Sequence, residues 1–381
     1  MTTQIHNPAA VQKAVQELMP LVEPLLAWYD RSHRILPWRE HPTAYRVWIS
    51  EIMLQQTRVE AVRPYYERFL EAVPDLSQLA RIPEEALLKL WEGLGYYNRA
   101  RNLKKAAVRI EEEFGGQMPD NREQLLTLPG IGSYTAGAIA SIVFGEAVPA
   151  VDGNVLRILA RVRMDDGDIL NQGVRKAAEA ALSAVMPKER AGDFNQAMME
   201  LGAVVCIPNG APRCGDCPWQ SFCRAKAAGC AAQYPKKAPK KARTVEKKTI
   251  LLIQDENRTA LCKRPSRGLL AGMYEFPSLP GHLSEKEVLA WLEAKGYKAL
   301  HIRRLEEARH IFTHKEWHMM GYAIRVDELE RPSGQAGVPF LFAGREETEE
   351  KYPIPSAFSA YAGYVRVRLG NEKFGDDPDA V

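Results

Sequence analysis

The sequence lacks the features of several protein classes. No apolar run approaches the roughly 18 residues that a membrane-spanning helix needs, so we expect no membrane partner. The first ten residues lack a basic start followed by an apolar stretch, which predicts a cytoplasmic protein without a secretory signal. The net charge is only +3, and a total so close to balance still leaves room for a local basic patch.

Cysteine is also scarce, with 6 in 381 residues, which excludes a disulfide scaffold. Four of the six follow the pattern Cys206-x7-Cys214-x2-Cys217-x5-Cys223. Four thiolates spaced in this way can converge on one centre, and the clustering favours a metal or iron–sulfur site over disulfides. A zinc ion and an iron–sulfur cluster both take four cysteines, so the spacing alone leaves the two open.

The chain divides by pattern into two domains and a spacer. Residues 1–232 show helical spacing of apolar residues and short breaks, which predicts an all-α region of about ten helices. Residues 233–248 carry seven basic residues and two prolines, and we interpret them as a basic linker. Residues 249–369 alternate like strands around one helix, which predicts an α+β domain. The polar tail 370–381 is expected to be disordered.

A glycine-rich turn lies between two helical segments of the first region. Leu128, Gly130 and Gly132 belong to the turn Leu128-Pro129-Gly130-Ile131-Gly132, which precedes the small-residue helix SYTAGAIASI. Glycines allow close approach of another backbone, and the free N–H groups at a helix start suit a phosphate oxygen. A plain helix–helix connection is the alternative interpretation of this turn.

Several motifs in order carry a resemblance to one family. The glycine turn, then Val151-Asp152-Gly153-Asn154-Val155, then the four cysteines resemble the helix-hairpin-helix DNA glycosylases of the endonuclease III superfamily. Leu36-Pro37-Trp38-Arg39, Ser50 to Val59 and Trp91 to Tyr97 are similar to MutY-type adenine DNA glycosylases. The resemblance implies an all-α glycosylase core with a cluster loop at 206–223, and a Nudix-like C-terminal domain.

The resemblance also implies a reaction, a cofactor and a partner. The expected substrate is double-stranded DNA with adenine opposite 8-oxoguanine or guanine, and the expected cofactor is a [4Fe-4S] cluster on the four cysteines. An endonuclease III-like glycosylase/lyase for oxidised pyrimidines and a non-enzymatic DNA-binding module remain the alternatives. We expect a monomer.

Cleavage of an N-glycosidic bond calls for two acidic groups, and the candidates are Glu51 and Asp152. One group protonates the leaving base while the other faces the cation-like sugar. Helical neighbours of Glu51 include Val47 and Trp48, which should desolvate its carboxyl group and raise its pKa. A surface glutamate is the alternative there. Asp152 precedes a helix, so a helix N-cap is its alternative.

Two further residues complete the expected catalytic set. Asn154 is expected to position Asp152. Tyr134 stands where bifunctional relatives are expected to carry a lysine, and a tyrosine cannot form a Schiff base with the sugar. The resemblance therefore implies a monofunctional enzyme that leaves an abasic site. Packing at a helix start is the alternative for Tyr134.

The remaining candidates are assigned by resemblance to the bases. Those expected around the adenine pocket are Arg34, Leu36, Trp38, Arg39 and Gln196. Those expected at the opposing base or inside the duplex are Gln56, Thr57, Leu94 and Tyr96, joined from the second domain by Phe312, Thr313 and His314. The paired acidic ligands of Nudix hydrolases are absent near Gly268–Gly296, which predicts a domain that reads the lesion and does not cleave pyrophosphate.

Overall fold

The computed structural model describes residues 8–238, 242–327, 340–367 and 369, so the predicted tail 370–381 lies outside the described residues. The chain forms two compact units. The first consists of Met1–Arg81 and Asn102–Lys240, and the second of Ile82–Arg101 and Lys241–Val381. Each unit is built around its own apolar core.

The first unit is helical, as its apolar spacing predicted. Leu25 and Leu26 are buried in α2, and Val47, Trp48 and Ile52 are buried in α4. Helices such as α3 and α9 are too short to show an apolar period in the sequence, and they raise the number of helices above the predicted ten. The helices of this part are α1 Pro8–Leu18, α2 Val22–Ser32, α3 Pro37–Glu40, α4 Ala44–Leu54, α5 Val59–Ala72, α6 Leu76–Arg81, α8 Asn98–Phe114, α9 Arg122–Leu125, α10 Ser133–Phe144, α11 Gly153–Arg163, α12 Gln172–Val185, α13 Ala191–Glu200 and α14 Arg224–Ala227.

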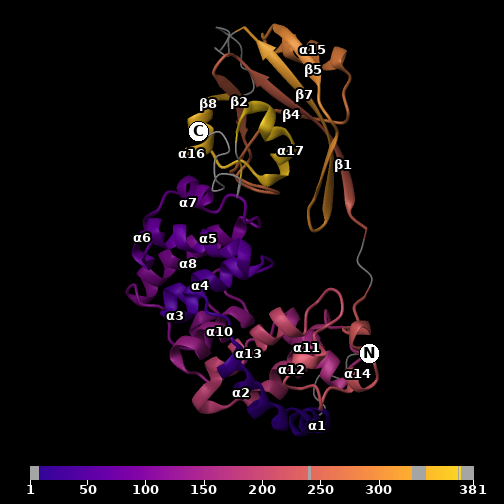
Figure 1. Cartoon of the computed structure of the whole chain (residues 1–381). Coiled ribbons are helices and arrows are strands. Elements are labelled where there is room, and N and C mark those ends of the chain that lie inside the picture. The colour runs from indigo at the N-terminus through magenta and orange to yellow at the C-terminus, as the bar shows by residue number, and fades with distance from the viewer. Residues whose placement is uncertain (1–7, 239–241, 328–339, 368, 370–381) are drawn as a thin grey trace. The chain divides into compact units, whose positions relative to one another are not determined.

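Helix α10 runs through the middle of this unit and contacts α4, α9 and α13 (Figure 1). Its small residues allow the close packing that their sequence predicted. A Cβ atom on Gly137 would lie 2.4 Å from the carbonyl oxygen of Pro149, so the backbone of residues 149–150 passes directly against the helix. That segment leads into Asp152, and α10 therefore fixes where the turn before α11 stands.

The second unit contains an eight-stranded mixed sheet in which β1 and β7 are parallel along their whole length. The path of the sheet is β3-β2-β1-β7-β5, with β4, β6 and β8 paired to β1, β7 and β2. The elements are α7 Glu84–Leu90, β1 Thr244–Gln254, β2 Arg258–Lys263, β3 Tyr274–Glu275, β4 Ser278–Pro280, α15 Glu285–Ala294, β5 Ala299–Arg304, β6 Ala308–Ile311, β7 Lys315–Val326, β8 Phe340–Gly344, α16 Arg345–Glu350 and α17 Ser359–Ala362.

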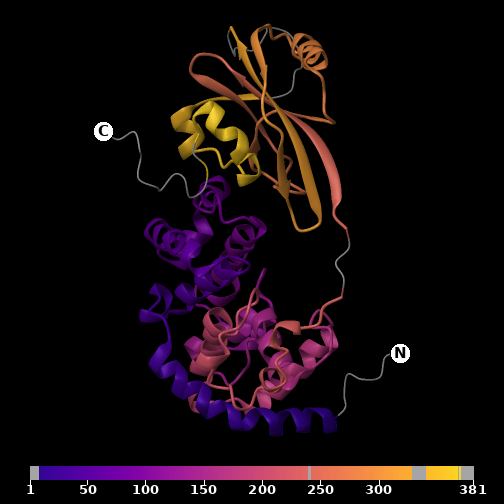
Figure 2. The same cartoon turned by 45° about the vertical axis from the view of Figure 1, so that its right-hand side comes forward.

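Successive residues of β1 point to opposite faces of this sheet, and both faces are covered. Ile250 and Leu252 pack with α17 residues such as Tyr361, whereas Leu251 and Ile253 pack with α15 residues such as Val288. Figure 2 shows α15 and α17 on opposite sides of the strands. Burial on both faces explains the unbroken apolar run of this strand.

The boundaries of the second unit differ from those expected. Strand β1 begins at Thr244, inside the predicted linker 233–248, because its first residues already pair with β7 from Lys315 onward. Residues 82–101, expected in the helical region, belong to the second unit. The reason is a set of polar contacts: the Lys89 ammonium donates to the carbonyl oxygens of Thr348 and Tyr352.

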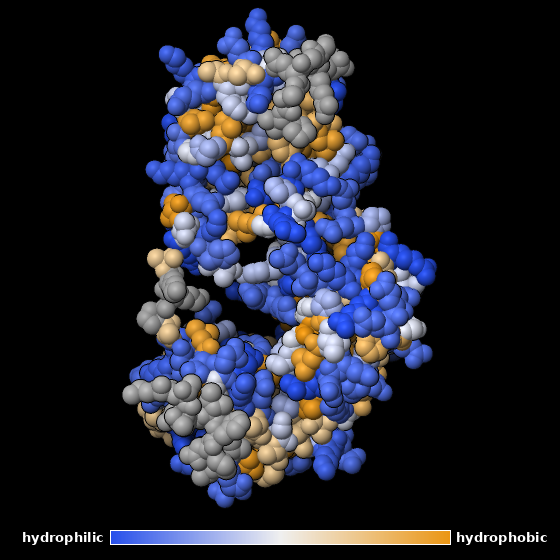
Figure 3. Space-filling model, turned by 180° about the vertical axis from the view of Figure 1, so that it is seen from behind, coloured by the Kyte–Doolittle hydropathy of each residue, from blue (hydrophilic) through white to orange (hydrophobic). Residues whose placement is uncertain are grey.

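The surface in Figure 3 is dominated by hydrophilic residues, with apolar side chains in small groups. Among the described residues, no helix combines the length and apolar character needed to cross a bilayer. The one helix predicted within residues 249–369 corresponds to α15, which begins with a capping box in which Ser284 and Glu287 form both reciprocal hydrogen bonds.

Candidate active site

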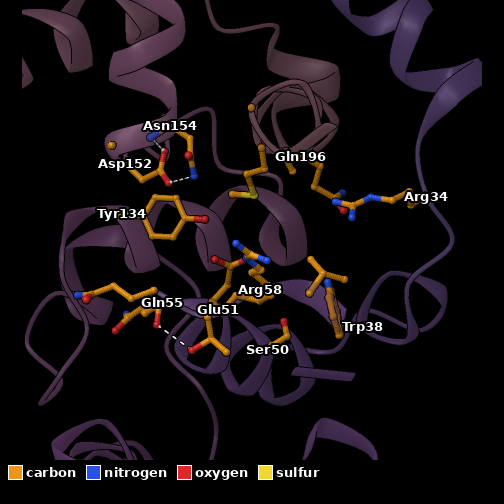
Figure 4. A pocket seen from close by; sticks show the side chains of 18 of the residues that line it. Arg34, Trp38, Ser50, Glu51, Gln55, Arg58, Tyr134, Asp152, Asn154 and Gln196 are labelled. Atoms are coloured by element: carbon orange, nitrogen blue, oxygen red, sulfur yellow. Dashed lines mark hydrogen bonds between the residues drawn. The ribbon is translucent and has the colours of Figure 1, made fainter. Parts of the chain in front are cut away.

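Glu51 and Asp152 line the same cavity of the first unit, which has a volume of about 740 Å³. The two groups come from different elements. Glu51 lies near the end of α4, and Asp152 immediately precedes α11. Figure 4 shows both side chains around this cavity, with Tyr134 between them. The carboxyl groups predicted as a pair are thus brought to one site.

Glu51 is buried, with only 5% of its surface exposed, so the alternative of a surface glutamate is excluded. Burial raises the pKa of its carboxyl group from 4.5 to about 7. A hydrogen bond with Tyr134 opposes that shift, the charge of Asp152 adds to it, and the Arg39 guanidinium opposes it. At neutral pH the group therefore holds a proton in part of the molecules.

Asp152 is the N-cap of α11 and also lines the cavity, so its capping role does not remove it from the candidate site. Its Oδ1 accepts hydrogen bonds of 2.8 Å from the backbone N–H groups of Asn154 and Val155. The side-chain amide of Asn154 donates to Oδ2 at 2.7 Å, drawn dashed in Figure 4. Three donors fix the carboxylate in one orientation at the positive end of the helix.

Asn154 also connects this carboxylate to the cysteine-containing segment. Its side-chain oxygen accepts a hydrogen bond of 2.7 Å from Arg157. Arg157 in turn donates to the carbonyl oxygens of Cys206, at 2.9 Å, and Gly202, at 2.9 Å. The Arg157 guanidinium is buried, and its N–H groups donate to these acceptors. It therefore connects the turn before α11 to the start of the cysteine loop.

Arg34 and Arg39 line the cavity together and share one buried carboxylate. Glu200, whose side chain is fully buried, lies 2.6 Å from Arg34 Nε and 2.9 Å from Arg39 Nη1. Desolvation of Glu200 is outweighed by the two arginines, which hold the pKa of its carboxyl group below the usual range. Two cations therefore stand at the wall of the cavity in fixed positions.

The other predicted pocket residues separate into two groups. Trp38, Gln56, Thr57 and Gln196 line the cavity. Leu36 does not: it is buried, and it precedes the short helix α3 as its N-cap residue.

Further cavity residues were not predicted. Ser50, Arg58 and Met199 are neighbours of predicted residues in the sequence, and this adjacency was the signal that could have found them. The contribution of Pro208 and Asn209, from the segment between the first two cysteines, has no signal in the sequence. All five line the cavity.

The four predicted cysteines line one small pocket of the first unit, together with apolar residues such as Ile158 and Trp219. Arg161 donates to the sulfur of Cys206 at 3.3 Å. Among the described residues, however, no three histidine, cysteine or acidic side chains are gathered so as to hold a metal ion.

The glycine turn has the geometry of a tight connection between α9 and α10. Leu128 is buried, and Gly130 has a φ of +79°, a left-handed conformation that favours glycine. A Cβ atom on Gly130 would lie 2.6 Å from Cβ of Asn102. Gly132 is exposed and is the N-cap of α10. The backbone of this turn is exposed at Gly130 and Gly132, where the sequence predicted a contact with a phosphate.

The second unit brings together residues predicted to read the opposing base. Tyr96 is 51% exposed and has a φ of +48°, while Leu94 is buried. The Tyr96 hydroxyl lies 3.3 Å from the hydroxyl of Thr313, at an exposed position. Of the residues on either side of Thr313, Phe312 packs edge-on against Trp317, and His314 is exposed. Tyr96, Thr313 and His314 can reach a ligand in this conformation, whereas Leu94 cannot.

Comparisons with known proteins agree with this architecture. Residues 49–184 match the family of HhH-GPD superfamily base excision DNA repair proteins, and residues 249–362 match the NUDIX domain. A solved structure of a thermostable thymine-DNA glycosylase is 28% identical, with a TM-score of 0.52 over 56% of this chain and 98% of that chain. Fold and cavity together thus define a helix-hairpin-helix DNA repair protein with a Nudix-like second domain, as predicted.

Relatives that span both units narrow this class. The adenine DNA glycosylase of Homo sapiens is 36% identical over 91% of this chain and 74% of its own length. That of Buchnera aphidicola subsp. Baizongia pistaciae is 34% identical over 76% of this chain and 82% of its own length. The chain belongs to the adenine DNA glycosylase family.

Proposed function

We propose that this chain removes adenine opposite 8-oxoguanine, or opposite guanine, from double-stranded DNA and leaves an abasic site. The observation that carries the proposal is the single cavity in which Glu51, with its raised pKa, faces Asp152. The similarity to adenine DNA glycosylases supports release of adenine, and a tyrosine at position 134, which cannot form a Schiff base, supports hydrolysis without strand cleavage.

The reaction requires the adenosine to leave the duplex, because its sugar and base edge are otherwise inaccessible. Glu51, carrying a proton near neutral pH, donates it to the departing purine, at N7 by family resemblance. As the C–N bond breaks, positive charge grows on the sugar. The Asp152 carboxylate stabilises that charge or bonds transiently to the sugar before water completes the reaction.

The first test is single-turnover release of adenine from a duplex with one adenine:8-oxoguanine pair. Glu51→Gln removes the proton donor, and Asp152→Asn removes the negative charge while keeping an oxygen that can cap α11. Each should lower the rate by about 10²-fold or more, the usual contribution of such a group. Turnover at the normal rate by either variant would contradict the mechanism.

The same assay separates the alternatives. Strand cleavage without alkali, with borohydride trapping of a lysine, would indicate a glycosylase/lyase for oxidised pyrimidines. Tight binding without base release over long incubation would indicate a DNA-binding module. Guanine in place of 8-oxoguanine in the substrate tests the second unit, where we propose that Tyr96, Thr313 and His314 contact the base left behind.

We propose that Cys206, Cys214, Cys217 and Cys223 hold a [4Fe-4S] cluster. Support comes from the four cysteines themselves, which line one pocket and supply the four thiolates that such a cluster takes. Bound there, a cluster would cross-link the loop that ends at Cys223. Anaerobically purified protein should contain about four iron atoms and absorb near 400 nm. Stoichiometric zinc without iron would refute the assignment.

A further inference from the structure

Glu200 is a buried carboxylate that does not line the cavity of Glu51 and Asp152, yet both arginines that pair with it do. It is the last residue of α13, one turn after Gln196. Its Oε1 accepts from the Arg34 guanidinium at 2.6 Å and from the Arg34 backbone N–H at 3.2 Å. Its Oε2 lies 2.9 Å from Arg39 Nη1 and accepts from Arg34 Nη2 at 3.4 Å.

The burial of this group needs an explanation. Placing an ionised carboxylate in the interior is costly unless it is paired, and an apolar side chain of similar volume would pack at less cost. Here the pairing joins two arginines from the segment before α3 and from α3 itself. Glu60 also lies 3.8 Å from Arg34, but its side chain is 78% exposed, so it is not a partner comparable to buried Glu200.

Arg39 connects this pair to the proposed proton donor. Its charge acts on Glu51 in the direction opposite to burial. The Arg39 guanidinium also donates to the backbone carbonyl of Arg34 at 3.2 Å and lies over the ring of Tyr29 at 5.9 Å. Glu200, 2.9 Å from Arg39 Nη1, balances much of the positive charge of this guanidinium.

We propose that Glu200 is a positioning residue that holds Arg34 and Arg39 at the cavity wall and balances their charge, so that Glu51 keeps its proton near neutral pH. The inference rests on the proposed function. Glu200 touches neither the cavity nor, by this account, the substrate. It acts through the two arginines alone.

Other groups around Glu51 would act on its proton as well, and the proposal leaves them unchanged. Tyr134 comes from α10 and Asp152 from the turn before α11. The charged residues that face the same cavity from the remaining elements are Arg34, Arg39, Arg58 and Glu60. Among all of these, Glu200 contacts only Arg34 and Arg39.

The test is the pH dependence of single-turnover adenine release by Glu200→Gln. The amide can still accept hydrogen bonds, but the negative charge is gone, so the uncompensated Arg39 should favour ionised Glu51. The part of the pH–rate profile in which the rate falls with rising pH, called the limb below, should move to lower pH. At pH values above the limb, each shift of half a pH unit should lower the rate about threefold. Glu200→Asp keeps the charge and should keep the limb.

Arg39→Gln provides the opposing arm. Loss of the Arg39 cation should move the same limb to higher pH, because less then opposes the rise that burial causes in the pKa of Glu51. If Glu200 had a purely structural role, its substitution would change the reaction amplitude or the stability of the protein. The limb would then not shift in opposite directions in Glu200→Gln and Arg39→Gln. Folded Glu200→Gln with the limb in its original place would overturn the proposal. Should that variant not fold, an unshifted limb in Arg39→Gln would overturn it equally.

Two controls separate the possible failures. Glu17 also bridges two arginines, Arg163 and Arg224, each at 2.8 Å, and it does not line the catalytic cavity. Glu17→Gln should leave the limb unchanged. Glu51→Gln should abolish the limb together with most of the rate. A normal rate and profile in Glu51→Gln would refute the acid itself, a failure distinct from that of Glu200.

Discussion

Glu51, the proposed proton donor, would favour the reaction and oppose folding. Its carboxyl group ionises near pH 4.5 in an unfolded chain and at about pH 7 when buried. The folded state therefore binds its proton more tightly, and stability from this group is complete below pH 4.5 and lost as pH rises through 7. The difference of about 2.5 units corresponds to about 3 kcal/mol.

Glu51→Gln should therefore be more stable than the unmodified chain at pH 8, by up to about 3 kcal/mol, and only slightly different at pH 5. The amide matches the carboxyl group in shape and has no charge to bury. Thermal or denaturant unfolding at both pH values measures the difference. Equal stabilisation at pH 5 and pH 8 would mean that the gain comes from packing and not from ionisation.

The pH dependence of base release should report the ionisation of the same carboxyl group. Since Glu51 must be protonated to act, the single-turnover rate should fall tenfold per pH unit above about pH 7, the value at which burial sets its pKa. A rate independent of pH between 6 and 9 would contradict this assignment. Conversion of Tyr134 to Phe removes the hydrogen bond that opposes the shift, and should move the limb to higher pH.

At the scale of elements, α10 determines the position of the turn that carries Asp152. Gly137 touches the backbone of Pro149, and a Cβ atom there has no room. Gly137→Ala should displace residues 149–152 and reduce base release more than tenfold, at a stability cost of about 1–3 kcal/mol. Gly363→Ala is a matched control, because its Cβ atom would meet nothing within 4 Å. Normal activity in Gly137→Ala would show that the turn is positioned by other contacts.

The helices show what apolar spacing can and cannot predict. Long periodic segments such as α2 and α4 were anticipated because their buried faces repeat every three or four residues. The four-residue helices α3 and α9 are too short to show a period. The start of β1 was missed because Lys247 and Lys248 look like linker composition, although pairing with β7 makes them strand residues.

The candidate site was predictable to a similar degree. Burial of Glu51 could be inferred from its apolar neighbours, but its role required the family resemblance. The same holds for Asp152, since an N-cap aspartate looks the same in sequence. Glu200 could not be found, because nothing in its own segment indicates the two arginines more than 160 positions away that neutralise it. Long-range pairing of charges leaves no local pattern.

At the scale of the whole molecule, residues 82–101 join the second unit although the helical region surrounds them in sequence. Lys89 holds this segment, with its side chain 12% exposed, and it pairs with buried Glu92 at 3.3 Å. Glu92 accepts a hydrogen bond from the backbone N–H of Ile354 at 2.7 Å. The loop that carries Tyr96 follows directly, so its position depends on the same anchor.

Lys89→Met should loosen this anchor by about 2 kcal/mol or more, since two carbonyl oxygens and a buried carboxylate lose their cation. Hydrogen exchange should quicken in residues 345–354 and 84–97. We also expect poorer discrimination between 8-oxoguanine and guanine, measured as the ratio of the two single-turnover rates. Lys105→Met, at an exposed position of α8, should change neither. Unchanged exchange in the Lys89 variant would contradict the anchor.

Asp152 caps α11 in addition to its proposed role in catalysis, and this bears on how descendants of such an enzyme would diverge. Selection for a well-formed α11 preserves this aspartate whether or not a base is ever excised, so its survival in a relative says little about activity. Glu51 brings no such benefit and weakens the fold above pH 7. When excision ceases to matter, the glutamate should drift first, and its replacement marks a lineage that has abandoned the chemistry.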